Sequence, residues 1–397
     1  MKSLNPKLLI EINKNEFIFV VIKNENENIQ NIDKIIIPLN GFNSNKISDY
    51  DIVFQILKKN IYLLEQKLNY IFNEVVLIIE NFDCKLINFS GFKKLNGSQL
   101  SKENISYIIN SLKSNINEVE KKKTILHIFN SKFTLDKKDL ENLPIGLFGN
   151  FYCHELAFFL IDDNDFKILQ EIFSKCNLRI KKILSKNFIE SVNILESNTT
   201  LKNFLKLSIN KKNTEIFFIE NSSLKFIQSF EFGTDIILND ISKVTGINKK
   251  NVELILKETN FSINNIKNEI LENNFFKDQN FRKIKKKLII DIAEARIKEF
   301  AEIIIFQNIN TSIFIQKKIP FFLAIDDRKQ FKCLDKSYSF FFSQNNHFEL
   351  KFIDQSTKDK MYNHINTLVQ FGWKSEAVPV LQEKKSIIAR IFDLFFG

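Results

Sequence analysis

The chain has 397 residues, of which 44% are hydrophobic and 26% are charged, and its formal net charge at pH 7 is +10. This length and balance predict an ordinary globular protein with two or more domains, and they argue against a disordered or fibrous chain. The positive charge does not indicate a nucleic-acid partner, because Lys is spread through a chain rich in Ile, Asn and Phe, and the only dense basic run is FRKIKKKL at 281–288.

Cysteine and histidine spacing indicates neither a metal site nor a disulfide framework. The four Cys include no C-x-x-C pair, and the four His show no H-E-x-x-H or similar ligand spacing. Cys153 and His154 are neighbours, but adjacent strand residues point to opposite faces, so they are not predicted to act together. The N-terminus has no signal-peptide core, and no apolar run approaches the roughly 18 residues of a membrane-spanning helix. We therefore expect a cytoplasmic chain.

The first half of the chain is predicted to mix strands and helices. Its elements are strands at 8–12 and 17–22 around a turn at Asn13-Lys14-Asn15, a helix at 51–68, a strand at 75–79, a helix within 99–118, a strand at 124–129, a compact loop at 143–149 and a helix at 166–176. Ser101 is the expected N-cap of the second helix, with Glu103 in its first turn.

The second half opens in the same way. LSINKKNTEIFF at 207–218 alternates apolar and polar residues around the turn Asn210-Lys211-Lys212-Asn213, which predicts a hairpin over 205–219. A strand at 223–233, helices over most of 236–306 and a strand at 321–325 are expected to follow. The two hairpin openings, near 8–22 and near 205–226, predict an internally duplicated α/β fold.

Motifs in the middle of the chain point to one family. The first motif is a predicted strand that contains a His, followed about nine residues later by an Asp and then by a Pro-Ile-Gly-x-x-Gly loop. Its residues are His127, Asp136, Pro144, Ile145, Gly146 and Gly149. FEFGTDIILNDISKVTGI adds Gly233, Asp235, Asp240 and Ile241, and IAEARIKEFAEII adds Arg296 and Glu299. With the duplicated openings, these stretches resemble the actin and sugar-kinase superfold and, within it, the FtsA family of bacterial cell-division proteins. The resemblance covers nearly the whole chain in order.

The resemblance implies an actin-like (ribonuclease H-like, duplicated) α/β fold with an inserted subdomain peculiar to that family and a C-terminal amphipathic helix. The implied parts are subdomain 1A at 1–80, 166–201 and 360–380, subdomain 1C at 81–165, subdomain 2A at 202–236 and 302–359, subdomain 2B at 237–301, and a linker with the terminal helix at 381–397.

In the family, three glycine-bearing turns hold ATP and magnesium, and here all three lack glycine. They are Glu11-Ile12-Asn13-Lys14-Asn15-Glu16, then Ser208 with Asn210, Lys211 and Lys212, and finally Leu323-Ala324-Ile325-Asp326-Asp327. Side chains at these turns would hold a triphosphate away from the backbone N–H groups. We therefore expect a non-catalytic protein with no confidently assigned cofactor or metal. Glu11, Thr214, Glu215 and Gly233 keep family-like positions and are vestigial candidates for nucleotide binding.

The last residues, EKKSIIARIFDLFFG, are predicted to form an amphipathic helix behind a polar tether. One arc is apolar and consists of Ile387, Ile388, Ile391, Phe392, Leu394, Phe395 and Phe396. Arg390 lies on the opposite side, and Lys384 and Lys385 precede the first turn. About 14 residues at 1.5 Å each span only about 20 Å, so the helix would lie in the surface of an anionic membrane. The FtsA family ends in such a helix. A terminal helix packed on the protein's own core is the alternative.

The resemblance, together with the predicted terminal helix, implies a peripheral protein on the cytoplasmic side of the inner membrane, at the division site, which anchors filaments of the tubulin-like protein FtsZ. In the family the C-terminal tail of FtsZ binds the segment matching 237–301, and Arg296, Arg282 and Lys285 are the candidates here. The alternative for Arg296 is a pair with Glu299 or Glu302. Self-association into filaments or dimers and contacts with other divisome proteins are also expected. An active actin-fold ATPase or kinase, and the related pilus-assembly protein, remain the alternative functions.

Overall fold

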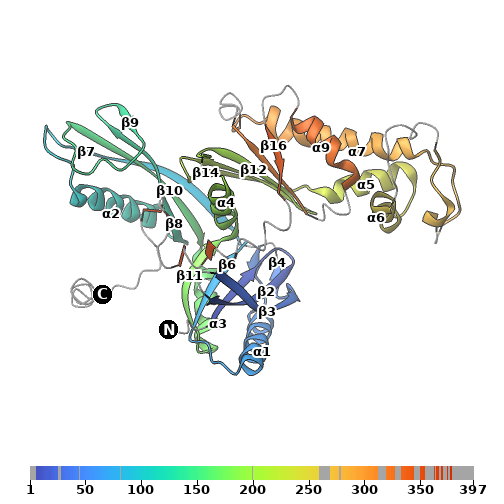
Figure 1. The fold of residues 1–397 in the computed structure, drawn as a ribbon, viewed down its shortest axis with the longest axis horizontal. Coiled ribbons are helices and arrows are strands. Elements are labelled where there is room, and N and C mark those ends of the chain that lie inside the picture. The colour runs from blue at the N-terminus through green and yellow to red at the C-terminus, as the bar shows by residue number, and fades with distance from the viewer. Residues whose placement is uncertain are drawn as a thin grey trace. The chain divides into compact units, whose positions relative to one another are not determined.

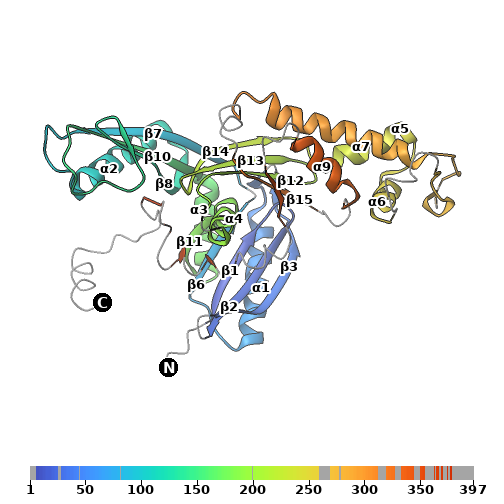
Figure 2. The same ribbon diagram turned by 45° about the horizontal axis from the view of Figure 1, so that its top comes forward.

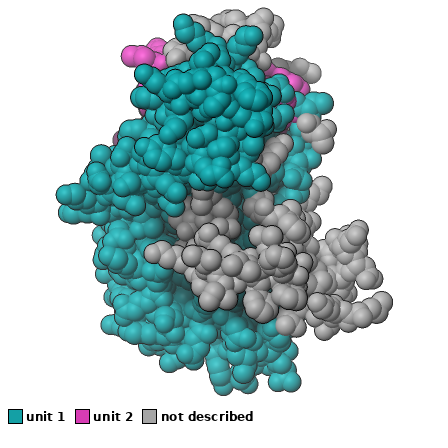
Figure 3. Space-filling model, turned by 90° about the vertical axis from the view of Figure 1, so that its left-hand side faces the viewer, with its two compact units in different colours: residues 1–200, 220–225, 358–397 teal, residues 201–219, 226–357 magenta. Residues whose placement is uncertain are grey.

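The computed structural model describes residues 6–25, 28–43, 45–80, 82–198, 200–258, 269–276, 279–311, 319–326, 332–343 and 349–353, with residues 362, 364, 365, 368, 369, 373, 376 and 377 (Figure 1). The predicted terminal helix and its membrane-binding residues 384–396 lie outside these residues. Contacts divide the chain into unit 1 (Met1–Thr200, Glu220–Lys225 and Lys358–Gly397) and unit 2 (Leu201–Ile219 and Phe226–Thr357), coloured in Figure 3. The finer subdomain boundaries stay a prediction. No described helix has the length and apolar character needed to cross a membrane.

Unit 1 contains a five-stranded sheet in the order β11-β6-β1-β2-β3. Its strands are β1 (Lys7–Ile12), β2 (Glu16–Glu25), β3 (Asn28–Pro38), β6 (Glu74–Ile79) and β11 (Arg179–Ser185), and its helices are α1 (Tyr50–Leu68), α3 (Asp163–Lys175) and α4 (Lys186–Ser197). β1 pairs antiparallel with β2 and parallel with β6, and β6 pairs parallel with β11. β1 and β6 are almost continuously buried, as the inner strands of a parallel sheet are expected to be. Figure 2 shows β1, β2 and β3 beside one another.

A second sheet, in the order β7-β10-β8-β9, is inserted in unit 1 between β6 and α3. Its elements are β7 (Cys84–Lys94), α2 (Lys102–Val119), β8 (Lys123–Leu135), β9 (Lys138–Leu140) and β10 (Phe151–Asp162). The predicted cap Ser101 is confirmed, although the side chain that completes its capping box is Asn104. A Cβ at Gly91 would come 2.5 Å from Ile108 of α2, so this glycine permits the close approach of helix and sheet.

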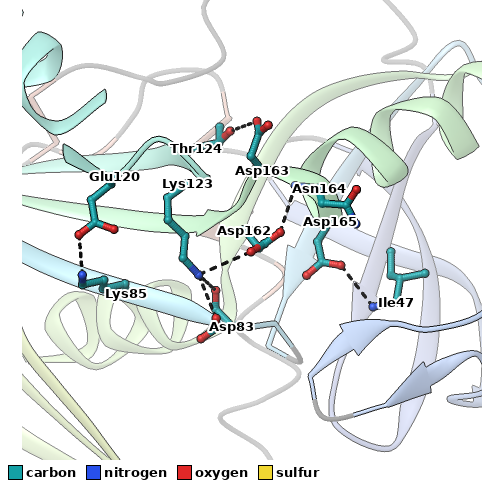
Figure 4. A network of polar contacts seen from close by, with 10 residues as sticks. All are labelled: Ile47, Asp83, Lys85, Glu120, Lys123, Thr124, Asp162, Asp163, Asn164 and Asp165. Atoms are coloured by element: carbon teal, nitrogen blue, oxygen red, sulfur yellow. Dashed lines mark hydrogen bonds and ion pairs between the residues drawn. The ribbon is translucent and has the colours of Figure 1, made fainter. Parts of the chain in front are cut away.

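Charged side chains join the base of the inserted sheet to its neighbours (Figure 4). Lys123 Nζ lies 2.9 Å from Asp83 Oδ2 and 3.9 Å from Asp162 Oδ2. Thr124 Oγ1 donates a 2.8 Å hydrogen bond to Asp163, and the backbone N–H of Ile47 donates to Asp165. Three of these carboxylates lie at the cap or in the first turn of α3, where the helix dipole favours negative charge.

Unit 2 is built on a five-stranded sheet in the order β14-β13-β12-β15-β16. The strands are β12 (Phe204–Ile209), β13 (Thr214–Glu220), β14 (Ser223–Phe230), β15 (Phe321–Ile325) and β16 (Leu350–Phe352), and the helices are α5 (Thr234–Thr245), α6 (Lys249–Glu258), α7 (Lys286–Ala301) and α9 (Asp335–Phe342). Short 3-10 turns at Asn273–Phe276 and Lys332–Leu334 and a π turn at Glu302–Phe306 complete the described elements. The strand predicted over 223–233 ends early, because Gly233 is already the N-cap of α5.

The two five-stranded sheets have the same topology, which confirms the predicted duplication. In each, a central strand pairs antiparallel with the next strand of its hairpin and parallel with a later strand: β1 with β2 and β6, and β12 with β13 and β15. A further parallel strand follows on the same side, β11 in unit 1 and β16 in unit 2. The turns after β1 and β12 therefore occupy equivalent places in the two halves.

Candidate functional site

The first turn, after β1, is closed by hydrogen bonds within the chain. The side-chain oxygen of Asn13 accepts from the backbone N–H groups of Asn15 (2.9 Å) and Glu16 (2.7 Å). The N–H of Asn13 itself donates to the carbonyl of Glu16 at 3.1 Å. In a phosphate-binding turn such N–H groups point at the anion. Here three of these donors are bonded to the turn itself.

Beside this turn lies a cluster of charged side chains. Glu11 is 3% exposed, and its carboxylate accepts from the hydroxyl of Tyr362 at 2.9 Å and lies 3.0 Å from Lys186 Nζ. Lys186 also contacts the carboxylate of Glu80, and Lys14 Nζ lies 3.8 Å from Glu80. Burial by itself would lower the pKa of Lys186, but the charges of Glu80 and Glu11 outweigh it and raise that pKa well above its usual value.

The second turn, after β12, is closed by the beginning of α5. The N–H of Thr234 donates to the carbonyl of Asn210 at 3.0 Å, and the N–H of Asp235 donates to the carbonyl of Lys211 at 2.9 Å. A helix N-terminus offers free N–H donors that commonly bind anions. At α5 two of these donors are bonded to the turn. A Cβ at Gly233 would lie 2.0 Å from the Asn210 carbonyl oxygen, so the glycine is needed for this packing.

The remaining residues of the second turn bond to nearby parts of unit 2. Thr214 is fully buried, and its hydroxyl donates to the carbonyl of Phe232 at 2.7 Å. The side-chain amide of Asn213 donates to Glu215 at 3.2 Å. Of the third turn, residues 323–325 lie in β15, and the N–H of Asp326 donates to the carbonyl of Ile209 at 2.9 Å. Asp327 lies outside the described residues. Three vestigial candidates thus belong to unit 2, whereas Glu11 belongs to unit 1.

His127, the first residue of the family motif, belongs to a buried polar network. Its Nδ1 lies 2.9 Å from Glu376 Oε1, and its Nε2 accepts from the backbone N–H of Ser185, which places the ring proton on Nδ1. Lys182 Nζ lies 3.2 Å from the other oxygen of Glu376 and donates to the carbonyl of Leu368. Burial raises the pKa of Glu376, but the hydrogen bond from His127 and the charge and hydrogen bond of Lys182 hold it below its usual value.

The same network fixes residues 376–377 to β8. Glu376 forms a β-bridge with Phe129, and the N–H of Ala377 donates to the carbonyl of Ile128 at 2.6 Å. The indole N–H of Trp373 donates to the carbonyl of Ser222 at 3.0 Å. The stretch before the predicted tether is therefore anchored in unit 1. Sequence reasoning missed Lys182 and Glu376, because neither belongs to a motif and 194 positions separate them.

The Pro-Ile-Gly loop has a structural basis in unit 1. The N–H of Gly146 donates to the carbonyl of Leu100, whose own N–H donates to Leu147, both at 2.9 Å. Gly146 has a φ of +87°, a backbone region that favours glycine. The Asp136 carboxylate accepts from the N–H groups at positions 150 and 151. The motif residues thus hold the loop against the start of α2.

The predicted partner residues lie on or near α7. Arg296 Nε donates to Asp240 Oδ2 at 2.6 Å, and its Nη1 donates to Glu299 Oε2 at 2.5 Å, so it links α7 to α5. Its pairing with Glu299 is the alternative expected from the sequence, and Asp240 is an addition. Arg282 and Lys285 are exposed, and Lys285 is the N-cap residue of α7.

Comparison with known proteins gives a distant but extended similarity. No protein-family model matches the chain. It is 21% identical over 285 residues to the cell division protein FtsA of Buchnera aphidicola subsp. Schizaphis graminum, and 19% identical over 284 residues to that of subsp. Acyrthosiphon pisum. Each match covers 70% of this chain and 66% of the relative. The PilM-PilN type IV pilus biogenesis complex contains a solved chain that is 11% identical, with a TM-score of 0.55, covering 91% of this chain and 96% of that one.

The topology and these similarities agree on the architecture. Two five-stranded sheets of one strand order, with helices and an inserted sheet, form an actin-like fold. The sequence similarity is to proteins named for cell division. The chain therefore has an actin-like fold and is similar to cell-division proteins of the FtsA type.

Proposed function

We propose that this chain is an actin-like cell-division protein that tethers FtsZ filaments to the inner face of the membrane and works by binding, without ATP turnover. The observation that carries the binding-only part is the closure of the turns after β1 and β12. Three N–H groups of the first turn, the N–H of Asn210 in the second turn and the first two donors of α5 are bonded to the chain itself.

The energetic argument follows from these bonds. A triphosphate at the second turn would have to displace the bonds from Thr234 and Asp235, and a typical hydrogen bond contributes about 0.5–1.5 kcal/mol. The side chains of Lys211 and Lys212 stand where glycines would let phosphate approach the backbone. Binding would therefore first have to open a formed structure, which weakens affinity by that cost.

The cell-division part is supported by the similarity to two FtsA proteins and by the actin-like fold. The proposed anchor is the stretch 384–397, which follows the segment fixed to β8 by Glu376 and Ala377. The proposed partner is the C-terminal tail of FtsZ, and the site is the α7 region with Arg296, Arg282 and Lys285. The location is the division site on the cytoplasmic face of the inner membrane.

Co-sedimentation with anionic vesicles in the absence of ATP tests the proposal. FtsZ filaments should enter the vesicle pellet only when this chain is present. They should stay in the supernatant with a chain lacking residues 384–397, with Phe392→Asp, or with FtsZ lacking its C-terminal tail. Equal pelleting of FtsZ with the truncated chain would contradict the tether.

A second candidate is a pilus-assembly role, which the TM-score of 0.55 to the PilM-PilN complex favours. It predicts binding of a PilN-type peptide in place of the FtsZ tail. Titrating both labelled peptides against the same preparation separates the two functions. The cell-division role predicts binding of the FtsZ tail alone, and the pilus-assembly role predicts binding of the PilN-type peptide alone.

A further inference from the structure

Three parallel strands of unit 1 end at one edge, and each contributes a charged residue there. Glu11 lies in β1, Glu80 directly follows β6, and Lys186 directly follows β11 at the start of α4. The backbone N–H of Glu80 donates to the carbonyl of Ile12 at 3.0 Å, which fixes the first two strands side by side at this point. The edge therefore places two carboxylates around one ammonium group.

The ammonium group of Lys186 contacts both carboxylates. Lys186 Nζ lies 3.0 Å from Glu11 Oε1 and within hydrogen-bond distance of Glu80 Oε2. The second oxygen of Glu11 accepts from the Tyr362 hydroxyl. The side chains of Glu11, Glu80 and Lys186 are 4%, 12% and 12% exposed, so water supplies little of their solvation.

Two carboxylates this close and this buried cannot both stay ionised without a cation. Proteins meet that need with a bound metal ion, with protonation, or with a basic side chain. Lys14 is a second cation, but it is 3.8 Å from Glu80, and Glu190 on α4 adds a further negative charge near Lys186. Among the residues that the structure describes, Lys186 is thus a cation that contacts both carboxylates.

We infer that Lys186 is a built-in counter-ion that occupies, on the carboxylate pair of Glu11 and Glu80, the place a divalent cation would otherwise take. This edge of unit 1 therefore carries its own cation at the carboxylate pair, which lowers its need for a metal ion or a nucleotide. The inference rests on the geometry of unit 1 alone and holds whichever partner the chain binds. The raised pKa of Lys186 is consistent with it, since that shift keeps the ammonium charged throughout the physiological range.

The test replaces the ammonium and asks whether a metal ion can substitute for it. The full chain and K186M are melted in EDTA, in magnesium and in calcium. K186M leaves the buried carboxylate of Glu11 without the ammonium group and Glu80 with Lys14 at 3.8 Å, so it should melt roughly 10 °C lower in EDTA. Calcium or magnesium should recover at least half of that loss, and neither ion should move the melting temperature of the wild type.

Three further variants control the experiment. K186R keeps a cation and should behave as the wild type does towards both ions. In K186M/E80Q one carboxylate is neutral, so the ion effect should disappear. K14Q removes a lysine that lies farther from Glu80 and should create no ion dependence.

The inference is overturned if K186M melts as the wild type does, if divalent ions stabilise both proteins equally, or if their effect persists in K186M/E80Q. Should K186M not fold in EDTA, the same comparison is made on refolding yield. Recovery of folded K186M by calcium supports the inference, and its failure with calcium, alongside successful refolding of K186R, overturns it.

Discussion

Nδ1 of His127 lies 2.9 Å from Oε1 of Glu376, a residue 249 positions further along the chain. Both side chains are almost completely buried, with exposures of 0% and 1%. Lys182 completes the group on the other carboxylate oxygen. A buried charge of this kind is tolerated only while its partners stay in place. The position of residues 376–377 therefore depends on the intact network of His127, Glu376 and Lys182.

Removing the Glu376 carboxylate should release this segment and destabilise unit 1. Glu376→Ala leaves Lys182 buried without its carboxylate, so we expect a loss of about 3–5 kcal/mol in unfolding free energy. Glu376→Gln keeps a hydrogen-bond acceptor and should cost less. Urea unfolding gives the free energies, and limited proteolysis should detect faster cleavage near residue 377 in both variants.

An exposed pair serves as the matched control. Glu171 lies 2.9 Å from Lys175 on the surface of α3, and both side chains are about half exposed. Such pairs contribute between about 0 and 1 kcal/mol, so Glu171→Gln should change stability little. If Glu376→Ala costs no more than Glu171→Gln, the buried network does not anchor the segment.

His154 should make stability fall in mild acid. Burial lowers its pKa from 6.5 to about 4, and Nδ1 has no hydrogen-bond partner among the described residues. The unfolded chain then binds a proton that the folded chain excludes, so the full contribution is present above pH 6.5 and is lost as the pH falls towards 4. At about 1.36 kcal/mol per pH unit, the loss approaches about 3 kcal/mol.

His154→Leu isolates this contribution. The variant loses the 2.9 Å contact with Asn130 and should be less stable at neutral pH. Its unfolding free energy should nevertheless depend less on pH between 6.5 and 4 than that of the wild type. Parallel curves for the two proteins in this range, measured by urea unfolding, would show that His154 does not titrate as expected. Glu376, whose pKa is lowered, adds its own loss only below about pH 4.5, so the two windows are separable.

Gly233 should be intolerant of any side chain, for a reason unrelated to nucleotide. Its added Cβ would lie 2.0 Å from the Asn210 carbonyl oxygen and push α5 off the second turn. Gly233→Ala should therefore lower the melting temperature of unit 2 by roughly 10 °C. Gly97→Ala is the comparison without a steric clash, because nothing lies within 4 Å of its added Cβ and its cost is limited to the backbone strain of a side chain at a φ of +82°. Equal melting of the two variants would contradict the packing role.

ATP with magnesium should leave the wild type unaffected. Titration calorimetry should detect no binding in the low-micromolar range, and hydrolysis should not exceed the background. The physical reason is the closure of the turns after β1 and β12 by their own hydrogen bonds. A micromolar dissociation constant would favour the ATPase alternative and remove the proposal of a binding-only protein.

Much of the architecture could be predicted from local pattern. β1, β2, α1, β6 and the hairpin of unit 2 lie close to their predicted ranges, because alternation and apolar periodicity are read from neighbouring residues. β3, β7, β10, β11 and α4 were not among the predicted elements. β7, with the sequence CKLINFSGFKK, carries polar and small residues, and its place is decided by pairing with β10, some 65 residues later.

The site shows the same division between local and distant information. The loss of glycine from the turns is visible in the sequence, but the hydrogen bonds that close the turns could not be predicted from it. The bonds from Thr234 and Asp235 come from a helix that begins more than 20 residues after the turn. Lys186 and Glu376 belong to no motif, and their role appears only when distant strands and segments meet.

The last prediction concerns the FtsZ tail. From the sequence, Arg296→Glu should reduce tail binding without changing the melting temperature. The structure alters that expectation, because Arg296 holds Asp240 and Glu299, and a Glu there would repel both. Arg296→Glu should therefore lower the melting temperature by a few degrees as well as weaken binding, so it cannot separate the two effects.

Lys285→Glu is the sharper test. Lys285 is exposed at the start of α7, and its substitution leaves the link from α7 to α5 intact. If the acidic tail of FtsZ binds here, a reversed charge should weaken binding at least fivefold at moderate salt, with an unchanged melting temperature. Lys298→Glu, at the other end of α7, reverses the same charge on an exposed position and is the matched control. Fluorescence anisotropy with a labelled tail peptide gives both affinities. Equal weakening by both variants would indicate general electrostatic attraction to unit 2 and would remove Lys285 from the site.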